Sequence, residues 1–213
     1  MGYINFSMPK EIVLKFKEKG VIKNFIETGT FRGGTAFWAA KNFDKVYTIE
    51  IDPEISRSTA SKPDCPKNIS FYIGNSRDVL PDICRNLKGR SIFWLDGHWC
   101  NVSDFGKDDE CPLIDEIKSI HNLSDSVILI DDARAFLGPL PPPHDNSQWP
   151  RIDDIILLLK KQFPQSTVTI ADDVIYCIPP DLVDVFSEDW ILNFHKRFGE
   201  SKSLFGKLVS KFK

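Results

Sequence analysis

The amino-acid sequence predicts a doubly wound α/β sheet, mostly parallel, with an antiparallel C-terminal hairpin and helices on both faces. Short apolar runs alternate with helical patterns along the chain, which is typical of parallel strands joined by crossover helices. No internal repeat interrupts this alternation. The 213 residues suit one domain, since domains commonly span about 100–200 residues.

The individual elements follow from the alternation and from turn residues. Ser76 is a plausible N-cap for a helix that begins there. Two apolar runs, 167–170 and 174–178, flank Asp172 and Asp173 and predict a hairpin. We also expect strands at 24–27, 45–51, 70–73, 91–95 and 126–130, and helices at 9–19, from about Gly34, and at 53–60, 76–87, 112–121 and 151–163.

The segment 138–150 is not expected to form a regular element. It contains five prolines, which remove backbone donors and fix an extended backbone. It follows closely after a strand, and long loops at such places more often serve function than connection.

Composition excludes several classes of protein. The longest apolar runs fall far short of the ~20 residues that cross a bilayer, and the first ten residues lack the pattern of a signal peptide. The five cysteines are scattered, as in a reducing compartment. We therefore expect a cytoplasmic protein.

Charge divides the chain into two predicted parts, an α/β domain over 1–195 and a basic tail over 196–213. The tail carries a net charge of +5, although the whole chain carries −3. No basic, aromatic-rich surface precedes it, so nucleic acid is not expected as a partner. Within 203–213, Phe205, Leu208, Val209 and Phe212 follow helical spacing. Such a helix packs on its own domain or a second subunit, or lies on a membrane surface.

A glycine-bearing turn follows the first predicted strand. Gly29 allows a sharp turn, and Gly33 and Gly34 let backbone N–H groups approach a ligand at the start of the next helix. Phe31 occupies the second glycine position of the dinucleotide-binding pattern, which disfavours NAD. Glu27, two residues before the first glycine, suits a cationic or amine-bearing ligand. A plain strand–helix turn is the alternative.

The ends of the next two strands carry polar groups suited to a nucleoside. Glu50 lies some twenty residues after the glycine turn, where an acid can accept both ribose hydroxyls. Asp52 precedes Pro53 and fits a helix cap. Asn75 and Ser76 follow the third strand, where small polar groups suit the edge of an adenine ring.

Three aspartates follow the fourth and fifth strands. If these strands are neighbours, their ends lie about 4.8 Å apart. Asp96, Asp131 and Asp132 would then repel one another unless they share a cation or a proton. Carboxylate oxygens are the ligands that Mg²⁺ prefers, so the three predict a divalent metal site. Each of them could instead cap a loop.

These residues belong to five motifs that occur in the order and spacing of a known family. Over residues 20–180 the chain resembles the class I S-adenosylmethionine-dependent, metal-dependent O-methyltransferases, such as catechol O-methyltransferase and the macrolide-sugar O-methyltransferases. The fold that this implies is Rossmann-like. The motifs are Glu27-Thr-Gly-Thr-Phe-Arg-Gly33, Thr48-Ile-Glu50, Gly74-Asn-Ser-Arg-Asp78, Leu95-Asp96-Gly-His98-Trp99 and Ile130-Asp131-Asp132.

The resemblance implies a role for each motif. The turn 27–34 would hold the methionine part of S-adenosylmethionine, Glu50 the ribose, and Asn75 with Ser76 the adenine. The metal, Mg²⁺ or Mn²⁺, would be held by Asp96, Asp131 and Asp132. The implied cofactor residues are Glu27, Gly29, Thr30, Phe31, Gly33, Gly34, Thr35, Glu50, Ile51, Asn75 and Ser76.

The resemblance leaves the general base open. Cys100 stands where the catechol enzyme has its lysine base. Asp96 and His98 are the candidates within this sequence, since a histidine titrates near neutral pH.

The acceptor is expected to be a hydroxyl of a sugar or glycan rather than a catechol, because the Asp131-Asp132 pair resembles the sugar enzymes. Trp99 and Trp149 are candidates to stack on its ring, and Arg134 to bind its polar groups. The alternatives are a dinucleotide-dependent oxidoreductase and a non-catalytic binding domain.

Overall fold

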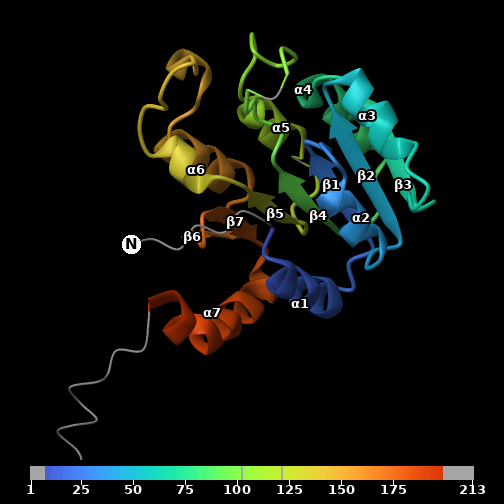
Figure 1. The fold of residues 1–213 in the computed structure, drawn as a ribbon. Helices are drawn as coiled ribbons and strands as arrows, with labels where there is room; N and C mark the ends of the chain where they lie inside the picture. Colours follow the sequence, from blue (N-terminus) through green and yellow to red (C-terminus); the bar gives the residue numbers. More distant parts are fainter. Residues whose placement is uncertain (1–7, 102, 121, 199–213) are drawn as a thin grey trace, which may run out of the picture.

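The computed structural model describes residues 8–101, 103–120 and 122–198. In these ranges seven strands form one sheet in the order β3-β2-β1-β4-β5-β7-β6 (Figure 1). Strands β1 to β5 are parallel, and β7 is antiparallel to both β5 and β6. This confirms the predicted fold class. The strands are β1 (Asn24–Thr28), β2 (Lys45–Glu50), β3 (Ile69–Ile73), β4 (Ser91–Leu95), β5 (Val127–Ile130), β6 (Thr167–Ala171) and β7 (Val174–Ile178).

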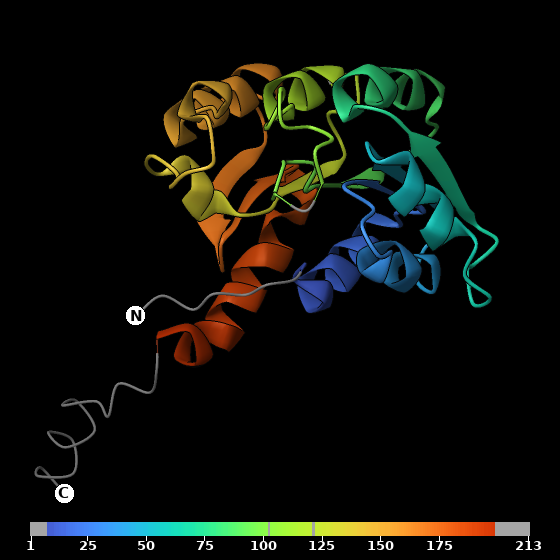
Figure 2. The same cartoon turned by 45° about the horizontal axis from the view of Figure 1, so that its top comes forward.

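Helices cover both faces of the sheet, with α4, α5 and α6 above it and α1, α2 and α7 below it in Figure 2. Three short 3-10 helices lie in the connections. The helices are α1 (Lys10–Gly20), α2 (Gly34–Ala40), α3 (Pro53–Ala60), α4 (Ser76–Asn86), α5 (Leu113–Ser119), α6 (Ile152–Gln162) and α7 (Val183–Phe198), and the 3-10 helices are η1 (Ala133–Phe136), η2 (Asn146–Gln148) and η3 (Pro180–Leu182).

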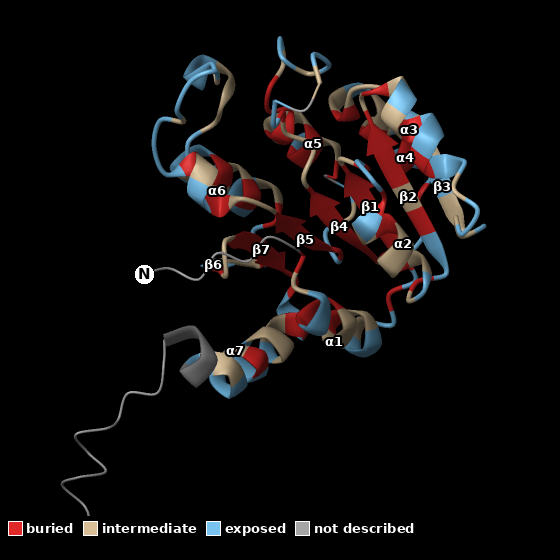
Figure 3. Ribbon diagram, in the orientation of Figure 1, coloured by how far each residue is buried: buried red, intermediate tan, exposed pale blue. Residues whose placement is uncertain are grey.

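Two apolar cores, one on each face, hold these layers together. Leu80, Ile117 and Leu159 belong to the core beneath α4, α5 and α6. Phe16 of α1 belongs to the core on the opposite face, with the ring of Phe25 from β1. Because both faces are covered, β1, β4, β5 and β7 are buried along their whole length (Figure 3).

The strand order reverses between β1 and β4, which are neighbours although two strands separate them in the sequence. The chain leaves β1 toward one side of the sheet and β4 toward the other, so a crevice opens at the carboxyl ends of these strands. Thr28 pairs with Leu95, and Leu95 pairs with Ile130. The register therefore brings three predicted site residues to one edge: Gly29, Asp96 and Asp131.

Most predicted boundaries agree with the structure to within two residues, and the predicted hairpin is confirmed. Asp172 and Asp173 form its two-residue turn, and both have positive φ. The predicted cap of α4 was wrong: Asn75 is the N-cap and accepts the N–H of Arg77, whereas Ser76 is the first helical residue. The helix α7 was not predicted.

The C-terminal helix α7 packs on the face of α1. Lys15 of α1 donates to Asp189 of α7 at 2.7 Å, and Phe186 and Trp190 pack on the core of that face. The helix continues to Phe198, past the predicted boundary at 195–196. The predicted tail helix at 203–213 lies outside the described residues. No helix in the described ranges is long and apolar enough to cross a membrane.

Candidate functional site

A cavity of about 300 Å³ opens at the carboxyl ends of β1, β2 and β4. Its lining residues come from the ends of β1, β2 and β3 and from the segment that follows β4. Four residues that follow β4 line one side of it, which we name the outer wall: Trp99, Phe105, Gly106 and Asp109. The predicted site residues that line it are Gly29, Phe31, Glu50, Ile51, Asn75, Ser76, Asp96, His98 and Trp99.

The turn after β1 is pressed against the end of β4. Gly29 has a φ of +86°, and a Cβ built on it would lie 2.3 Å from the carbonyl oxygen of Asp96. Its N–H donates to the carbonyl oxygen of Ile49 on β2 at 2.9 Å. Only glycine fits this position, because both the dihedral angle and the close approach exclude a side chain.

Glu27 lies beneath the turn rather than in the cavity. Its side chain is buried, and Oε2 accepts a hydrogen bond from Thr48 Oγ1 at 2.7 Å. Burial raises the pKa of Glu27 to about 8, against the lowering by this hydrogen bond. The carboxyl group is therefore mainly protonated at neutral pH, which does not suit the predicted contact with a cationic ligand.

Glu50 lines the cavity from the end of β2. Its Oε2 accepts the N–H of Phe31 at 2.8 Å, and its Oε1 accepts the N–H of Asp52 at 3.1 Å. The residue thus ties the glycine turn to β2. Asp52 caps α3 by accepting the N–H groups of Glu54 and Ile55, as its position before Pro53 predicts.

The adenine-edge candidates connect β3 to the outer wall. Asn75 Nδ2 donates to Asp109 Oδ2 at 2.6 Å, while its Oδ1 caps α4. Ser76 is buried beside it. Of the other predicted cofactor residues, four do not line the cavity: Thr30, Gly33, Gly34 and Thr35.

The three aspartates lie at one edge but do not form the predicted three-ligand cluster. Asp132 has a φ of +52°, and its carboxylate pairs with His98 Nε2 at 3.1 Å and with Arg134 Nη2 at 2.8 Å. Asp131 Oδ1 accepts the N–H of Asp132 at 2.8 Å. Among the described residues, no group of three His, Cys, Asp or Glu side chains is arranged to hold a metal ion. The side chains of His98 and Arg134 pair with Asp132 instead.

Burial and the neighbouring charges shift the pKa values of the three aspartates and of His98. Burial raises the pKa of Asp96 and of Asp131, and the neighbouring aspartates raise it further. Burial alone would lower the pKa of His98, but its hydrogen bond to Asp132 and the charges of the aspartates raise it. The pKa of Asp132 is lowered, first by that hydrogen bond. Asp96 and Asp131 therefore attract a proton or a cation.

The predicted acceptor residues lie in three different settings. Trp99 is buried, and its Nε1 donates to the carbonyl oxygen of Ser103 at 2.7 Å. Arg134 pairs with Asp173 as well as Asp132. Trp149 lies against His98, with ring centroids 5.4 Å apart.

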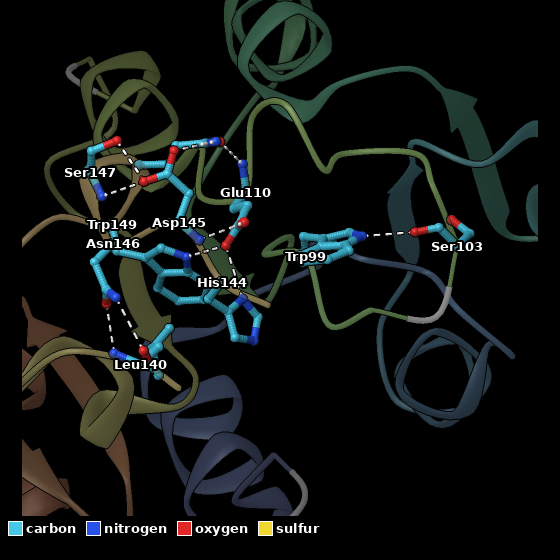
Figure 4. A network of polar contacts seen from close by, with 10 residues as sticks. Trp99, Ser103, Glu110, Leu140, His144, Asp145, Asn146, Ser147 and Trp149 are labelled. Atoms are coloured by element: carbon cyan, nitrogen blue, oxygen red, sulfur yellow. Dashed lines mark hydrogen bonds and ion pairs between the residues drawn. The ribbon is translucent and has the colours of Figure 1, made fainter. Parts of the chain in front are cut away.

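Sequence reasoning missed two buried carboxylates next to the cavity. Glu116 of α5 lies behind Gly97, where a Cβ would be 3.0 Å from its Oε1, and burial raises its pKa. Glu110 joins the outer wall to the proline-rich segment 138–150 (Figure 4).

Comparison with known proteins shows the fold. No family model and no curated protein matches this sequence. Among solved structures, the O-methyltransferase TomG from Streptomyces achromogenes, in complex with SAM, is 16% identical, with a TM-score of 0.53 over 83% of this chain and 82% of that chain. An O-methyltransferase from Bacillus cereus, in complex with SAH, is 16% identical, with a TM-score of 0.54 over 81% and 82% of the two chains. Cofactor-bound Rv0187 from MTB is also 16% identical, with a TM-score of 0.51 over 83% and 82%.

This chain shares its fold with these three proteins. In this fold the cavity lies at the point where the strand order reverses, which is the general ligand position in open α/β sheets. Gly29 and Phe31 of the glycine turn and the predicted residues at the ends of β2, β3 and β4 therefore converge where a ligand is expected.

The close approach at Gly29 predicts a sharp effect of substitution. Gly29→Ala should lower the free energy of unfolding by about 2 kcal/mol or more, because it combines a disfavoured φ with a backbone clash. Gly34→Ala is the matched control, since a Cβ there has nothing within 4 Å and Gly34 is helical. It should leave stability unchanged or raise it by up to about 1 kcal/mol. Equal effects in urea unfolding would contradict this account of the turn.

The raised pKa of Glu27 predicts how stability depends on pH. A raised pKa means that the native state binds a proton that the unfolded state has already lost. The free energy of unfolding should therefore fall as the pH rises from about 4.5 to about 8. Glu27→Gln should flatten this slope in urea titrations with EDTA, whereas Glu54→Gln, on the exposed start of α3, should not. An unaltered slope in Glu27→Gln would show that Glu27 is ionised in the native protein.

Proposed function

We propose that this chain is an S-adenosylmethionine-dependent O-methyltransferase. The observation that carries the proposal is the cavity itself: the Gly29 turn, Glu50 and Asn75 converge on it at the point where the strand order reverses. Its volume of about 300 Å³ suits a small molecule. The fold is shared with proteins that were solved with SAM or SAH bound.

The residues of the cavity fit S-adenosylmethionine. Gly29 and Phe31 of the turn after β1 line the cavity, and we assign the methionine part to this turn. Glu50 takes the ribose hydroxyls: each of its oxygens accepts one backbone N–H and has capacity for a second hydrogen bond. Asn75 and Ser76, with Ile51, lie along the wall assigned to the adenine.

We further propose that activity needs a divalent metal ion held by Asp96, Asp131 and Asp132. Carboxylate oxygens suit Mg²⁺ or Mn²⁺, and burial and mutual repulsion leave Asp96 and Asp131 attracting positive charge. His98 and Arg134, which pair with Asp132 in this structure, would have to give up that carboxylate. When bound, such an ion acidifies a hydroxyl of the acceptor and orients it.

Residues of the chain must also remove the proton of the acceptor hydroxyl. Methyl transfer needs an oxygen nucleophile in line with the S–CH₃ bond, and a hydroxyl is a poor nucleophile until its proton is lost. Asp96 lines the cavity, and we assign it or its neighbour His98 as the group that takes this proton. His98 Nδ1 lies 3.8 Å from Asp96 Oδ1, so the two side chains stand at the same end of the cavity.

The acceptor that we propose is a vicinal hydroxyl pair on a saccharide, with a catechol as the second candidate. Tryptophans border the site at Trp99 and Trp149, and an aromatic face suits the flat side of a sugar ring as well as an aryl ring. The choice of a saccharide rests on the resemblance of the Asp131-Asp132 pair to the sugar enzymes.

The cofactor assignment predicts a loss of affinity in Glu50→Ala. Removal of charge-assisted hydrogen bonds, worth about 1.5–3 kcal/mol each, should weaken S-adenosylhomocysteine binding about tenfold to a hundredfold in calorimetry. Glu50→Gln keeps one acceptor oxygen and should lose less. Glu54→Gln should bind as the wild type does. Unchanged affinity in Glu50→Ala would refute the ribose assignment, and stabilisation by NAD(H) instead would point to the oxidoreductase.

The metal assignment predicts loss of turnover without loss of cofactor. Asp131→Asn should reduce methyl transfer by at least about a hundredfold, because a carboxylate ligand becomes a neutral amide. S-adenosylhomocysteine affinity should stay within about twofold, since Asp131 does not line the cavity. Excess EDTA should have the same effect on the wild type, reversed by Mg²⁺. Full activity in EDTA would reject the metal and leave the aspartates as structural groups.

A further inference from the structure

The proline-rich segment 138–150, which we name the strap, is fastened to the outer wall of the site by Glu110 (Figure 4). Glu110 is 1% exposed. Its Oε2 accepts hydrogen bonds from Trp149 Nε1 at 2.6 Å and His144 Nδ1 at 2.9 Å, and its Oε1 accepts the N–H of Asp145 at 2.9 Å. Three donors of the strap thus converge on one carboxylate.

The backbone of Glu110 adds two more links. Its N–H donates to Gln148 Oε1 of the strap at 2.8 Å, and its carbonyl oxygen accepts the N–H of Trp99 at 2.7 Å. Burial alone would raise the pKa of Glu110, but the bonds from Trp149, Asp145 and His144 lower it below its ordinary value. A buried carboxylate stays ionised only while hydrogen-bond donors compensate for its lost hydration, so the charge of Glu110 depends on these three donors.

The strap also contains hydrogen bonds between its own residues. Asn146 closes a small loop with Leu140, accepting its N–H at 2.6 Å and donating to its carbonyl oxygen at 3.1 Å. Asp145 caps η2 by accepting the N–H and the hydroxyl of Ser147. The strap therefore has hydrogen bonds within itself in addition to those that join it to Glu110.

The rings that Glu110 holds stand against the residues of the cavity. Trp149 lies 5.4 Å from His98, and His144 lies 5.4 Å from Trp99, in each case between ring centroids. Trp149 and His144 contact each other at 5.5 Å. His98 and Trp99 line the cavity, so the two strap rings contact two residues of its lining.

We propose that the strap forms the acceptor-binding wall of the enzyme, with His144 and Trp149 facing a ring-bearing acceptor, and that Glu110 is the positioning residue that fixes this wall. The proposal rests on the function proposed above. Aromatic rings offer large contact area at low entropy cost and bind the C–H face of a sugar or the face of an aryl ring. An acceptor held there would lie next to His98 and the aspartates.

The simpler role for Glu110 is to anchor a loop over the apolar core, since Trp149 also packs against that core. The two roles differ in what a substitution changes. An anchor alone affects stability, whereas a positioning residue affects acceptor binding and leaves the cofactor site intact.

The test compares Glu110→Gln with the wild type in the full-length chain. A carboxamide presents an NH₂ group in place of one oxygen, so at least one of the three strap donors loses its acceptor. The measurements are calorimetric affinity for S-adenosylhomocysteine, then binding of catechol and of methyl mannoside at saturating S-adenosylhomocysteine and Mg²⁺, then KM and kcat. Asp181→Asn is the control, because it breaks an exposed ion pair with Arg90, next to the amino end of β4.

We expect Glu110→Gln to weaken binding of the probe that the wild type accepts, and to raise its KM, by about tenfold or more. S-adenosylhomocysteine affinity should stay within about twofold of the wild type, and Asp181→Asn should change neither quantity. Trp149→Phe keeps a ring but removes the donor. Its effect on KM should be less than additive with that of Glu110→Gln, because both break the same contact.

Several outcomes would overturn the proposal. Unchanged probe binding and KM in Glu110→Gln would make Glu110 an anchor only, as would an equal loss of cofactor affinity. A wild type that binds S-adenosylhomocysteine but neither probe would reject the strap as a wall for vicinal hydroxyls. Failure of the wild type to bind S-adenosylhomocysteine would instead refute the proposed function. If Glu110→Gln does not fold, Trp149→Phe carries the same comparison alone.

Discussion

A Cβ on Gly29 would lie 2.3 Å from the carbonyl oxygen of Asp96, and this contact between the turn after β1 and the end of β4 constrains everything around it. The approach is close because β1 and β4 are neighbours whose chains leave toward opposite faces of the sheet. The same register sets Asp96, at the end of β4, beside Asp131, at the end of β5. A side chain at position 29 would therefore disturb both halves of the site, the cavity and the aspartate edge.

Several carboxylates lie close together near this edge and repel one another when they are ionised. Each of them is protonated or paired in a different way. Glu27 has a pKa of about 8 and is mainly protonated at neutral pH. Glu50 accepts two backbone N–H groups, and Asp132 pairs with His98 and Arg134. Glu110 accepts three donors from the strap. Asp96 and Asp131 have raised pKa values and follow neighbouring strands, which is why a bound cation would act on these two.

The sequence alone predicted the features that depend on local rules. Strand β4 and helix α3 matched their predicted bounds, because apolar runs between turn residues and the Asp52-Pro53 cap are local patterns. The helix α7 was missed although Val183, Phe186 and Trp190 follow helical spacing. The role of Glu110 was beyond prediction, because its partners lie 34 to 39 residues away. The motifs that contain the three aspartates likewise did not predict that His98 and Arg134 would pair with the carboxylate of Asp132.

The two halves of the proposed site differ in how far the sequence alone could predict them. The half that we propose for the cofactor is built from strand ends, whose positions follow from the order of the sheet. The half that we propose for the acceptor is the strap, which three hydrogen bonds join to the buried carboxylate of Glu110. Trp99 joins the two, since it lines the cavity, contacts His144 and donates its N–H to the carbonyl oxygen of Glu110. On the proposed role of the strap as the acceptor wall, a change in the strap would alter the acceptor while the cofactor residues stay the same.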